Sequence, residues 1–249
     1  MRALITNDDG VDSAGIALLA RVALDAGLDV VVAAPHEERS GASASLTGMG
    51  VDDHLGIERT EIEGLRGVEV YAVQASPALI AFVATRGAFG APPDVVLSGI
   101  NHGPNTGAAV LHSGTVGAAL TALTHGVPAM ALSSLATRPS HWDTAEHVAH
   151  LAVTWMISHL TVDAVVNVNI PDVARSDFAG IVPASLARYG AVQAEIGDRG
   201  EDFVTVRFDE IHAEDDDSDA SLLARNWATV TALRPPSEVD SIDLSTLRE

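Results

Sequence analysis

Two adjacent carboxylates, Asp8 and Asp9, stand near the start of the chain in the segment Thr6-Asn7-Asp8-Asp9-Gly10. Side by side at the end of a strand, they repel each other unless a positive charge lies between them. A hard divalent cation such as Mg²⁺ or Mn²⁺ takes oxygen ligands of this kind. A turn stabilised by an aspartate side chain, with Gly10 supplying the unusual backbone angle, is the alternative interpretation.

A second polar segment, Ser98-Gly99-Ile100-Asn101-His102-Gly103-Pro104-Asn105-Thr106-Gly107, is dense in glycine, asparagine and proline, which predicts a tightly shaped loop. Asn101 could offer a neutral carbonyl oxygen to a metal, and Asn105 could donate a hydrogen bond to a phosphate oxygen. The loop at 35–41, which contains Ser40, has by itself the composition of an ordinary polar loop.

A third kind of signal lies in His112-Ser113-Gly114-Thr115-Val116-Gly117, which opens a predicted helix. Ser113, Gly114 and Thr115 would present backbone N–H groups and hydroxyls to an anion at the start of that helix. Simple helix capping explains the same residues equally well. Phosphate binding and capping therefore both stay open for this segment.

These segments need a framework that brings them together. Apolar strands are expected at 2–6, 29–34, 68–73, 94–98, 128–133 and 164–169, and helices alternate with them at 14–26, 77–88, 115–125 and 143–159. The alternation predicts an α/β fold in which helices cover both faces of a parallel sheet. Ligands of such sheets bind at the carboxyl ends of the strands, so the polar segments should meet at one edge.

The pattern changes after Pro171. Residues 172–202 are polar, 203–208 favour an isolated strand, and a final strand is expected at 227–233. We therefore expect a catalytic core at 1–171 and an antiparallel appendage at 172–249 whose final strand returns to the core. The acidic stretch at 214–217 is expected to be a solvated loop, with cation binding as the alternative.

Composition narrows the class of protein. The formal net charge is −20 and all 14 basic residues are arginine, which disfavours a nucleic-acid polymer as partner. An anionic substrate would need local positive potential from a metal or a helix N-terminus. There is no cysteine, so thiolate chemistry is excluded. Without a long apolar window or the apolar run of a signal peptide, no membrane span is expected, and the cytoplasm is the expected location.

Taken together, these segments resemble the SurE family of 5′/3′-nucleotidases over most of the chain. The resemblance extends to Asn167-Val168-Asn169-Ile170-Pro171 and to the acidic stretch before the last strand. It implies a Rossmann-like three-layer core, a C-terminal hairpin exchanged between subunits, and a homodimer or homotetramer. It also implies one divalent metal, Mg²⁺ or Mn²⁺, per subunit, held by Asp8, Asp9, Ser40 and Asn101, for hydrolysis of nucleoside 5′- and also 3′-monophosphates. Asp9 is one candidate general base, and the metal alone is the alternative.

Two positions depart from the family pattern. The family has a carboxylate where this chain has Leu79, and an aspartate where this chain has His36. These changes keep two alternatives open: a phosphatase for another small phosphate ester, and a non-catalytic paralogue that binds a nucleotide without turnover. A haloacid-dehalogenase-like phosphatase is disfavoured because Asn7 stands where its nucleophile would be. The Gly-x-Gly-x-x-Gly motif of dinucleotide-binding oxidoreductases and the Gly-x-Ser-x-Gly motif of acyl-transfer enzymes do not occur at the expected places.

Overall fold

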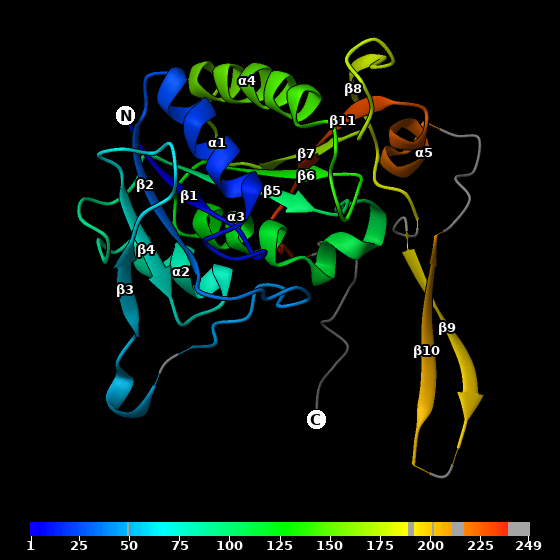
Figure 1. Ribbon diagram of the computed structural model, residues 1–249, viewed down its shortest axis with the longest axis horizontal. Coiled ribbons are helices and arrows are strands. Elements are labelled where there is room, and N and C mark those ends of the chain that lie inside the picture. Colours follow the sequence, from blue (N-terminus) through cyan, green and yellow to red (C-terminus); the bar gives the residue numbers. More distant parts are fainter. Residues whose placement is uncertain (49, 189–191, 201, 211–216, 239–249) are drawn as a thin grey trace, which may run out of the picture.

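The protein is described here from a computed structural model, which covers residues 1–48, 50–188, 192–200, 202–210 and 217–238. Its centre is a nine-stranded sheet with helices on both faces (Figure 1). The strands, in spatial order, are β3 (Ile57–Thr60), β4 (Glu69–Val73), β2 (Asp29–Pro35), β1 (Arg2–Thr6), β5 (Val95–His102), β6 (Ala129–Ser134), β7 (Val165–Ile170), β11 (Trp227–Leu233) and β8 (Gly180–Pro183).

The six strands from β4 to β7 run parallel to one another. Their residues are almost all buried and β-branched or small, as expected for strands covered on both faces. At the edges, β3 pairs antiparallel with β4, and β11 pairs antiparallel with β7. The predicted parallel α/β core is confirmed, and the structure adds an antiparallel strand near each edge.

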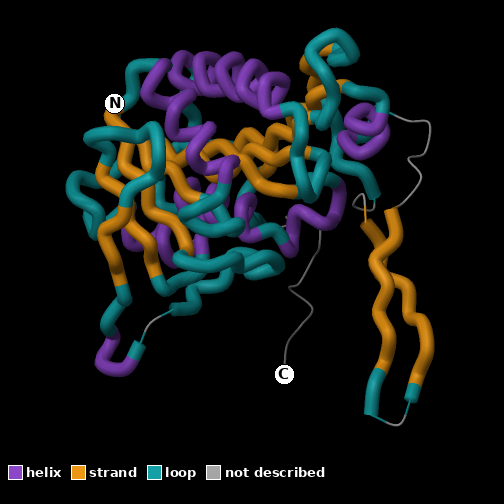
Figure 2. The backbone as a smooth tube through the Cα atoms, in the orientation of Figure 1, coloured by secondary structure: helices purple, strands orange, loops and turns teal. Residues whose placement is uncertain are grey.

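Two helix pairs cover the two faces of the sheet. Helices α1 (Ala14–Asp25) and α4 (Trp142–Ser158) pack together on one face, and α2 (Pro77–Ala84) and α3 (Gly114–Thr124) on the other (Figure 2). Each face thus has its own apolar cluster, built mainly from Val, Leu, Ile and Ala. Helix α1 begins at a cap, since the Ser13 side chain accepts a hydrogen bond from the backbone N–H of Ile16.

Several element boundaries differ from the sequence-based expectation. Helix α2 ends at Ala84 rather than 88, because the chain turns there and Gly87 takes a φ of +87°. Strand β5 continues to His102 instead of ending at 98, so Asn101 lies within a strand. The short strands β3 and β8 and helix α5 (Asp219–Ala224) were not predicted.

The C-terminal region contains a separate hairpin. Strands β9 (Val192–Arg199) and β10 (Val204–Glu210) form a two-stranded antiparallel sheet that projects from the body of the protein (Figure 1). Strand β11 then joins the main sheet. Of the acidic stretch at 214–217, residues 214–216 lie outside the described residues. Within the described ranges, every helix is too short or too polar to cross a bilayer.

Candidate active site

The candidate site lies at the topological switch point of the sheet, between β1 and β5, where the strand order reverses. From β1 the chain passes through α1 to β2 and reaches β4, then crosses through α2 to β5 on the other side of β1. Loops that leave the carboxyl ends of β1 and β5 therefore diverge to opposite faces and leave a crevice between them. The loop after β1 carries Asp8 and Asp9, and the end of β5 carries Asn101.

Asp8 is a carboxylate buried at the end of β1, with 4% of its surface exposed. The hydroxyl of Thr115, in the first turn of α3, donates a hydrogen bond to its Oδ1. Gly114 is required beside it, since a Cβ at that position would lie 2.7 Å from Oδ2 of Asp8. Burial raises the pKa of Asp8 to about 6, while the Thr115 hydrogen bond opposes that rise.

Asp9 lies beside Asp8 with only 9% of its side chain exposed. The backbone N–H of His102 donates to its Oδ2 at 3.0 Å, and Nδ1 of His102 lies 3.8 Å from its Oδ1. Burial raises the pKa of Asp9, the neighbouring His102 lowers it, and the charge of Glu38 adds to the rise. Two carboxylates thus share a buried position, and no arginine among the described residues forms an ion pair with either.

Asn101 and Ser40, the two neutral residues expected to bind the metal, differ in exposure and in hydrogen bonding. The Asn101 side-chain amide donates to the carbonyl oxygen of Gly103 at 2.7 Å, which leaves its own carbonyl oxygen as the free ligand group. Ser40 is exposed, and its hydroxyl donates to Oε1 of Glu38 at 2.7 Å. The loop of Ser40 is nonetheless tied to the aspartates, because the Arg39 N–H donates to the carbonyl oxygen of Asp8 at 2.7 Å.

Glu38 is the site residue that the sequence analysis missed. Its carboxylate contacts the Ser40 hydroxyl and lies near enough to Asp9 to raise that group's pKa. The sequence signal was an acidic residue within the polar loop that carries the expected serine ligand. Even so, no three or more Asp, Glu or His side chains gather as a metal-ligand set in the described part of the chain. A cation here would depend on two carboxylates and neutral oxygens.

The helix α3 supplies the opposite wall of the site. Ser113 is its N-cap and accepts a hydrogen bond from the N–H of Val116 at 3.0 Å. The N–H groups of Gly114 and Thr115 belong to the first turn, where an α-helix has no partner for them. The helix begins directly beside Asp8, and the Thr115 N–H already helps to lower the pKa of that carboxyl as a hydrogen-bond donor. The Gly114 N–H is the donor of this turn left for an anion. The structure thus brings Gly114 and Thr115 into contact with Asp8, with Ser113 next to them as the helix cap, in line with the predicted parallel sheet.

Asn105 is held from several sides. Its side-chain amide donates to Oγ of Ser133 at 2.7 Å, and its N–H donates to Oδ1 of Asn169 at 2.7 Å. The carbonyl oxygen of Asn105 accepts hydrogen bonds from the amides of Asn167 and Asn169. One hydrogen of the Asn105 amide is thus used by Ser133, and the second is the one that could reach a phosphate oxygen. Phosphate contact by Asn105 stays a prediction.

The two departures from the family pattern lie in different surroundings. Leu79 is buried in the apolar cluster beneath α2 and α3, with 4% of its surface exposed. A carboxylate at that position would face apolar neighbours, so leucine fits the core of this chain. His36 is exposed, and its Nε2 lies 3.8 Å from Oε2 of Glu37. The altered residue at 79 therefore serves packing in this chain.

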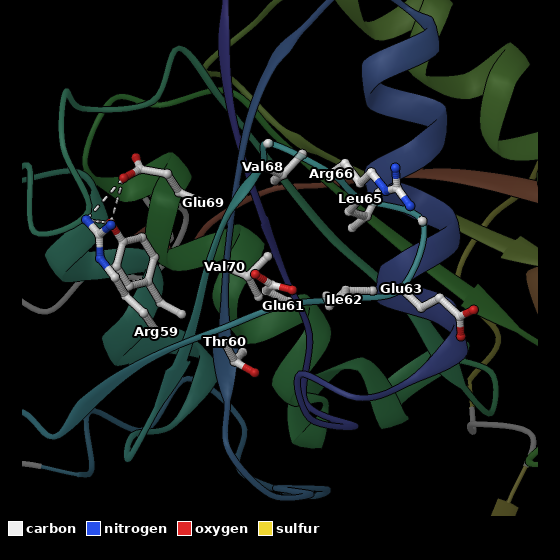
Figure 3. Close-up of a pocket in the computed structure, with 13 residues that line it drawn as sticks. Arg59, Thr60, Glu61, Ile62, Glu63, Leu65, Arg66, Val68, Glu69 and Val70 are labelled. Carbon is white, nitrogen blue, oxygen red and sulfur yellow. Dashed lines mark hydrogen bonds and ion pairs between the residues drawn. The ribbon is translucent and has the colours of Figure 1, made fainter.

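A hollow of about 650 Å³ lies elsewhere, at the edge of the sheet, lined by residues 59–71 of β3, β4 and their connection (Figure 3). Strand β2 separates β4 from β1, so this hollow is not part of the crevice at the aspartates. Its Arg59 is already paired with Glu69 at 3.2 Å and lies over the ring of Tyr71. The chemistry described above therefore does not extend to it.

Comparison with known proteins places this chain in a family. The family model described as Survival protein SurE matches residues 3–193. A protein of Aeromonas hydrophila named 5′-nucleotidase SurE is 41% identical over 182 residues, which cover 73% of this chain and 70% of that protein. A protein of Synechococcus elongatus with the same name is 34% identical, over 94% of this chain and 93% of that one.

The solved structures agree with the sequence comparison. The crystal structure of the SurE protein from Aquifex aeolicus superposes with a TM-score of 0.82 at 27% identity, covering 99% of this chain and 98% of that one. The resemblance drawn from the polar segments is thus confirmed, and so is the predicted fold. The chain belongs to the SurE family.

Proposed function

We propose that this chain is a metal-dependent 5′-nucleotidase, which hydrolyses nucleoside 5′-monophosphates to nucleoside and phosphate. The observation that carries the proposal is the pair of largely buried carboxylates, Asp8 and Asp9, with Asp8 set directly against the first turn of α3. A site with carboxylates on one wall and anion donors on the other suits a phosphate ester bridged to a cation. The relatives named 5′-nucleotidase SurE support a nucleotide as the ester.

A divalent cation fits the donor set of this chain. Burial makes two ionised neighbours costly, as the raised pKa values of Asp8 and Asp9 record, and a cation would offset that cost. Asp8, Asp9, Ser40 and Asn101 would hold Mg²⁺ or Mn²⁺. Such an ion, when bound, supplies Lewis-acid polarisation of the phosphoryl group and lowers the pKa of a water molecule. Ser40 would have to turn from Glu38 to take part.

The remaining residues bind and orient the substrate. The N–H groups of Gly114 and Thr115, with the Ser113 hydroxyl and the second amide hydrogen of Asn105, would hold the phosphate oxygens. The Thr115 hydroxyl and its backbone N–H both already donate toward Asp8, so a phosphate oxygen would share these donors with that carboxylate. In the reaction, water forms a bond to phosphorus as the bond to the nucleoside oxygen breaks. In this proposal Asp9 accepts the proton of that water, and activation by the cation alone is the alternative.

This arrangement also answers the charge problem of the chain. A protein with net charge −20 repels a phosphate ester at long range. The start of α3 and a bound cation would provide local positive potential at the one place where it is needed. Hydrolysis of 3′-monophosphates at the same site is a second expectation, because the groups proposed above bind the phosphate and do not select which sugar hydroxyl carries it.

The hairpin supports a proposal about assembly. Ile196 and Val206 are a cross-strand pair on β9 and β10, and they are 53% and 47% exposed. A two-stranded hairpin with apolar side chains in water is marginally stable alone. We propose that it packs on another subunit in a homodimer or homotetramer, with nucleoside monophosphates as the other partners of the chain.

Phosphate release from a panel of nucleoside 5′- and 3′-monophosphates and unrelated phosphate esters tests the activity. Assays would contain Mn²⁺, Mg²⁺ or EDTA, with Asp8→Asn as the inactive variant and the exposed Asp12→Asn as the matched control. Metal-dependent nucleotide turnover, lost only in Asp8→Asn, is the expected result. Turnover of other esters alone would assign a different substrate. Metal binding without turnover of any ester would refute the proposed enzymatic activity and indicate a paralogue that binds nucleotides without hydrolysing them.

A further inference from the structure

Asp219 is a second buried carboxylate, far from Asp8 in the sequence. It is the first residue of α5, and none of its surface is exposed. Its Oδ2 accepts a hydrogen bond from the N–H of Gly107 at 2.9 Å. Its Oδ1 accepts two more, from the N–H groups of Ala187 and Ala220, each at 2.8 Å. One side chain thus joins three segments of the backbone.

Two of these segments are the two ends of the hairpin. Ala187 precedes β9, and Asp219 itself follows β10. The same place is fixed by the backbone, because the Asp219 N–H donates to the carbonyl oxygen of Ser185 at 2.8 Å, and Ser185 and Ser218 form a parallel bridge. At the base of the hairpin, the two chain segments are therefore held together by one network of hydrogen bonds centred on Asp219.

The third segment belongs to the active site. Gly107 stands between Asn105 and Ser113, and from it the short helix η2 (Gly107–His112) leads directly to the N-cap of α3. Displacement of Gly107 would move the loop on one side and the helix start on the other. Through the hydrogen bond from the Gly107 N–H to Asp219, the base of the hairpin can fix the position of the loop and helix start proposed to bind phosphate.

A carboxylate at position 219 can accept all three of these hydrogen bonds at once. A buried ionised group is costly unless hydrogen bonds compensate for the lost water. Burial raises the pKa of Asp219, and the N–H groups of Gly107, Ala187 and Ala220 oppose that rise. Among the described residues no arginine or histidine forms an ion pair with it. An asparagine would have only one oxygen for donors that approach two, so only a carboxylate satisfies all three at once.

We propose that Asp219 is a positioning residue of the enzyme, which holds the loop at 103–107 in its phosphate-binding conformation and fixes it to the base of the hairpin. The inference rests on the proposed function for its kinetic part alone. Its structural part, that the Gly107 backbone depends on the Asp219 carboxylate, holds whatever the substrate is.

The test compares Asp219→Asn with Asp217→Asn, the same change at a neighbouring side chain that is 99% exposed. In Asp219→Asn the single amide oxygen should keep the two donors of Ala187 and Ala220, so the contact with Gly107 is the one that is lost. We expect faster backbone hydrogen exchange in peptides covering 103–112, with other peptides unchanged. With AMP and Mn²⁺ we expect KM to rise roughly 10-fold, on the scale of one lost hydrogen bond to a charged group, with little change in kcat. The affinity for Mn²⁺ should be unchanged, because the hydrogen bonds of Asp219 go to Gly107, Ala187 and Ala220 and not to the proposed metal ligands.

The outcomes separate cleanly. Unchanged exchange at 103–112, or an equal effect from Asp217→Asn, would overturn the proposal. A fall in kcat at constant KM would also overturn it, since positioning of the phosphate loop acts on substrate binding. If the wild type lacks turnover, the proposed function fails and the exchange experiment still decides the structural part. If exchange rises throughout Asp219→Asn, Asp219→Glu replaces it: the longer carboxylate should loosen 103–112 alone, and unchanged exchange there would refute the idea.

Discussion

Replacing Asp8 by asparagine should make the metal-free protein more stable while it abolishes activity. The side chain is buried and nearly isosteric after the change, and its amide oxygen can still accept the Thr115 hydrogen bond. What disappears is the ionised form. Burial raises the pKa of Asp8 from its ordinary 3.8 to about 6, so the folded chain binds a proton more tightly than the unfolded chain between those values.

The sign and size of the effect follow from linkage. Because the folded chain holds the proton longer, the free energy of unfolding of the metal-free protein falls as pH rises from about 4 to about 6, then levels off. A rise of roughly two pH units in the pKa corresponds to about 3 kcal/mol. Asp8→Asn removes this pH dependence. At pH 8 in EDTA it should therefore be more stable than the wild type by up to about 3 kcal/mol, and the gain should vanish near pH 4.

Urea unfolding of both proteins at pH 4.5, 6 and 8 in the presence of EDTA provides the measurement. Asp12→Asn, an exposed change in the same loop, should shift the free energy of unfolding by less than about 0.5 kcal/mol at each pH. Added Mn²⁺ should reverse the order at pH 8, since only the wild type keeps both carboxylates. A variant that is no more stable than the wild type at pH 8, or a gain independent of pH, would refute the reasoning.

Three further predictions concern the neighbours of Asp8 and the hairpin. Thr115→Val removes a hydrogen bond that lowers the pKa of Asp8, so the acid limb of the kcat/KM profile should move to higher pH; an unmoved limb would contradict this. Gly114→Ala places a Cβ 2.7 Å from Oδ2 of Asp8, and the displaced carboxylate should lower kcat/KM by on the order of 10²-fold while the circular dichroism spectrum stays the same; near-normal turnover would show that the site can relax. Ile196→Glu with Val206→Glu puts like charges on the exposed face of the hairpin, so sedimentation velocity should show dissociation to smaller species; an unchanged sedimentation coefficient would exclude this face from the subunit interface.

The core could be predicted because its local and tertiary signals agree. The strand at 2–6 and the strand at 227–233 were placed with the bounds that the structure has. Both are apolar runs closed by polar residues, and nothing in their surroundings opposes the pattern. The same agreement brought Asp8, Asn101 and Gly114 to one edge of the sheet, since each follows or starts an element whose direction was already fixed.

The missed elements depend on partners that the local sequence does not show. Strand β3 is exposed and polar, with the sequence Ile-Glu-Arg-Thr, and it is a strand only because β4 offers an edge. Helix α5 has six residues and begins at a cap, Ser218, within an acidic region that favoured a loop. Strand β9 contains Gly197 and several polar residues, and its pairing with β10 decides its conformation.

The site shows the same division between residue identity and geometry. Asp8 and Thr115 were both singled out, but their hydrogen bond joins residues 107 positions apart and no spacing rule could give it. Glu38 was passed over because a charged residue in a loop is usually solvated, and only the return of that loop toward Asp9 gives it a role. Leu79 looked like a loss at the site, while the structure places it in the core.

The hairpin leaves the core and returns to it at nearly one point, as the bridge between Ser185 and Ser218 shows. A segment whose ends adjoin is a self-contained insertion, and the entropy of closing it grows only slowly with its length. Such a segment can be lengthened, shortened or replaced by a brief loop while β1, β5 and α3 keep their register. The sequences of the crevice and of the projecting hairpin can therefore diverge at different rates. Engineered hairpins can be grafted at this point if they keep Asp219, the carboxylate that contacts both regions.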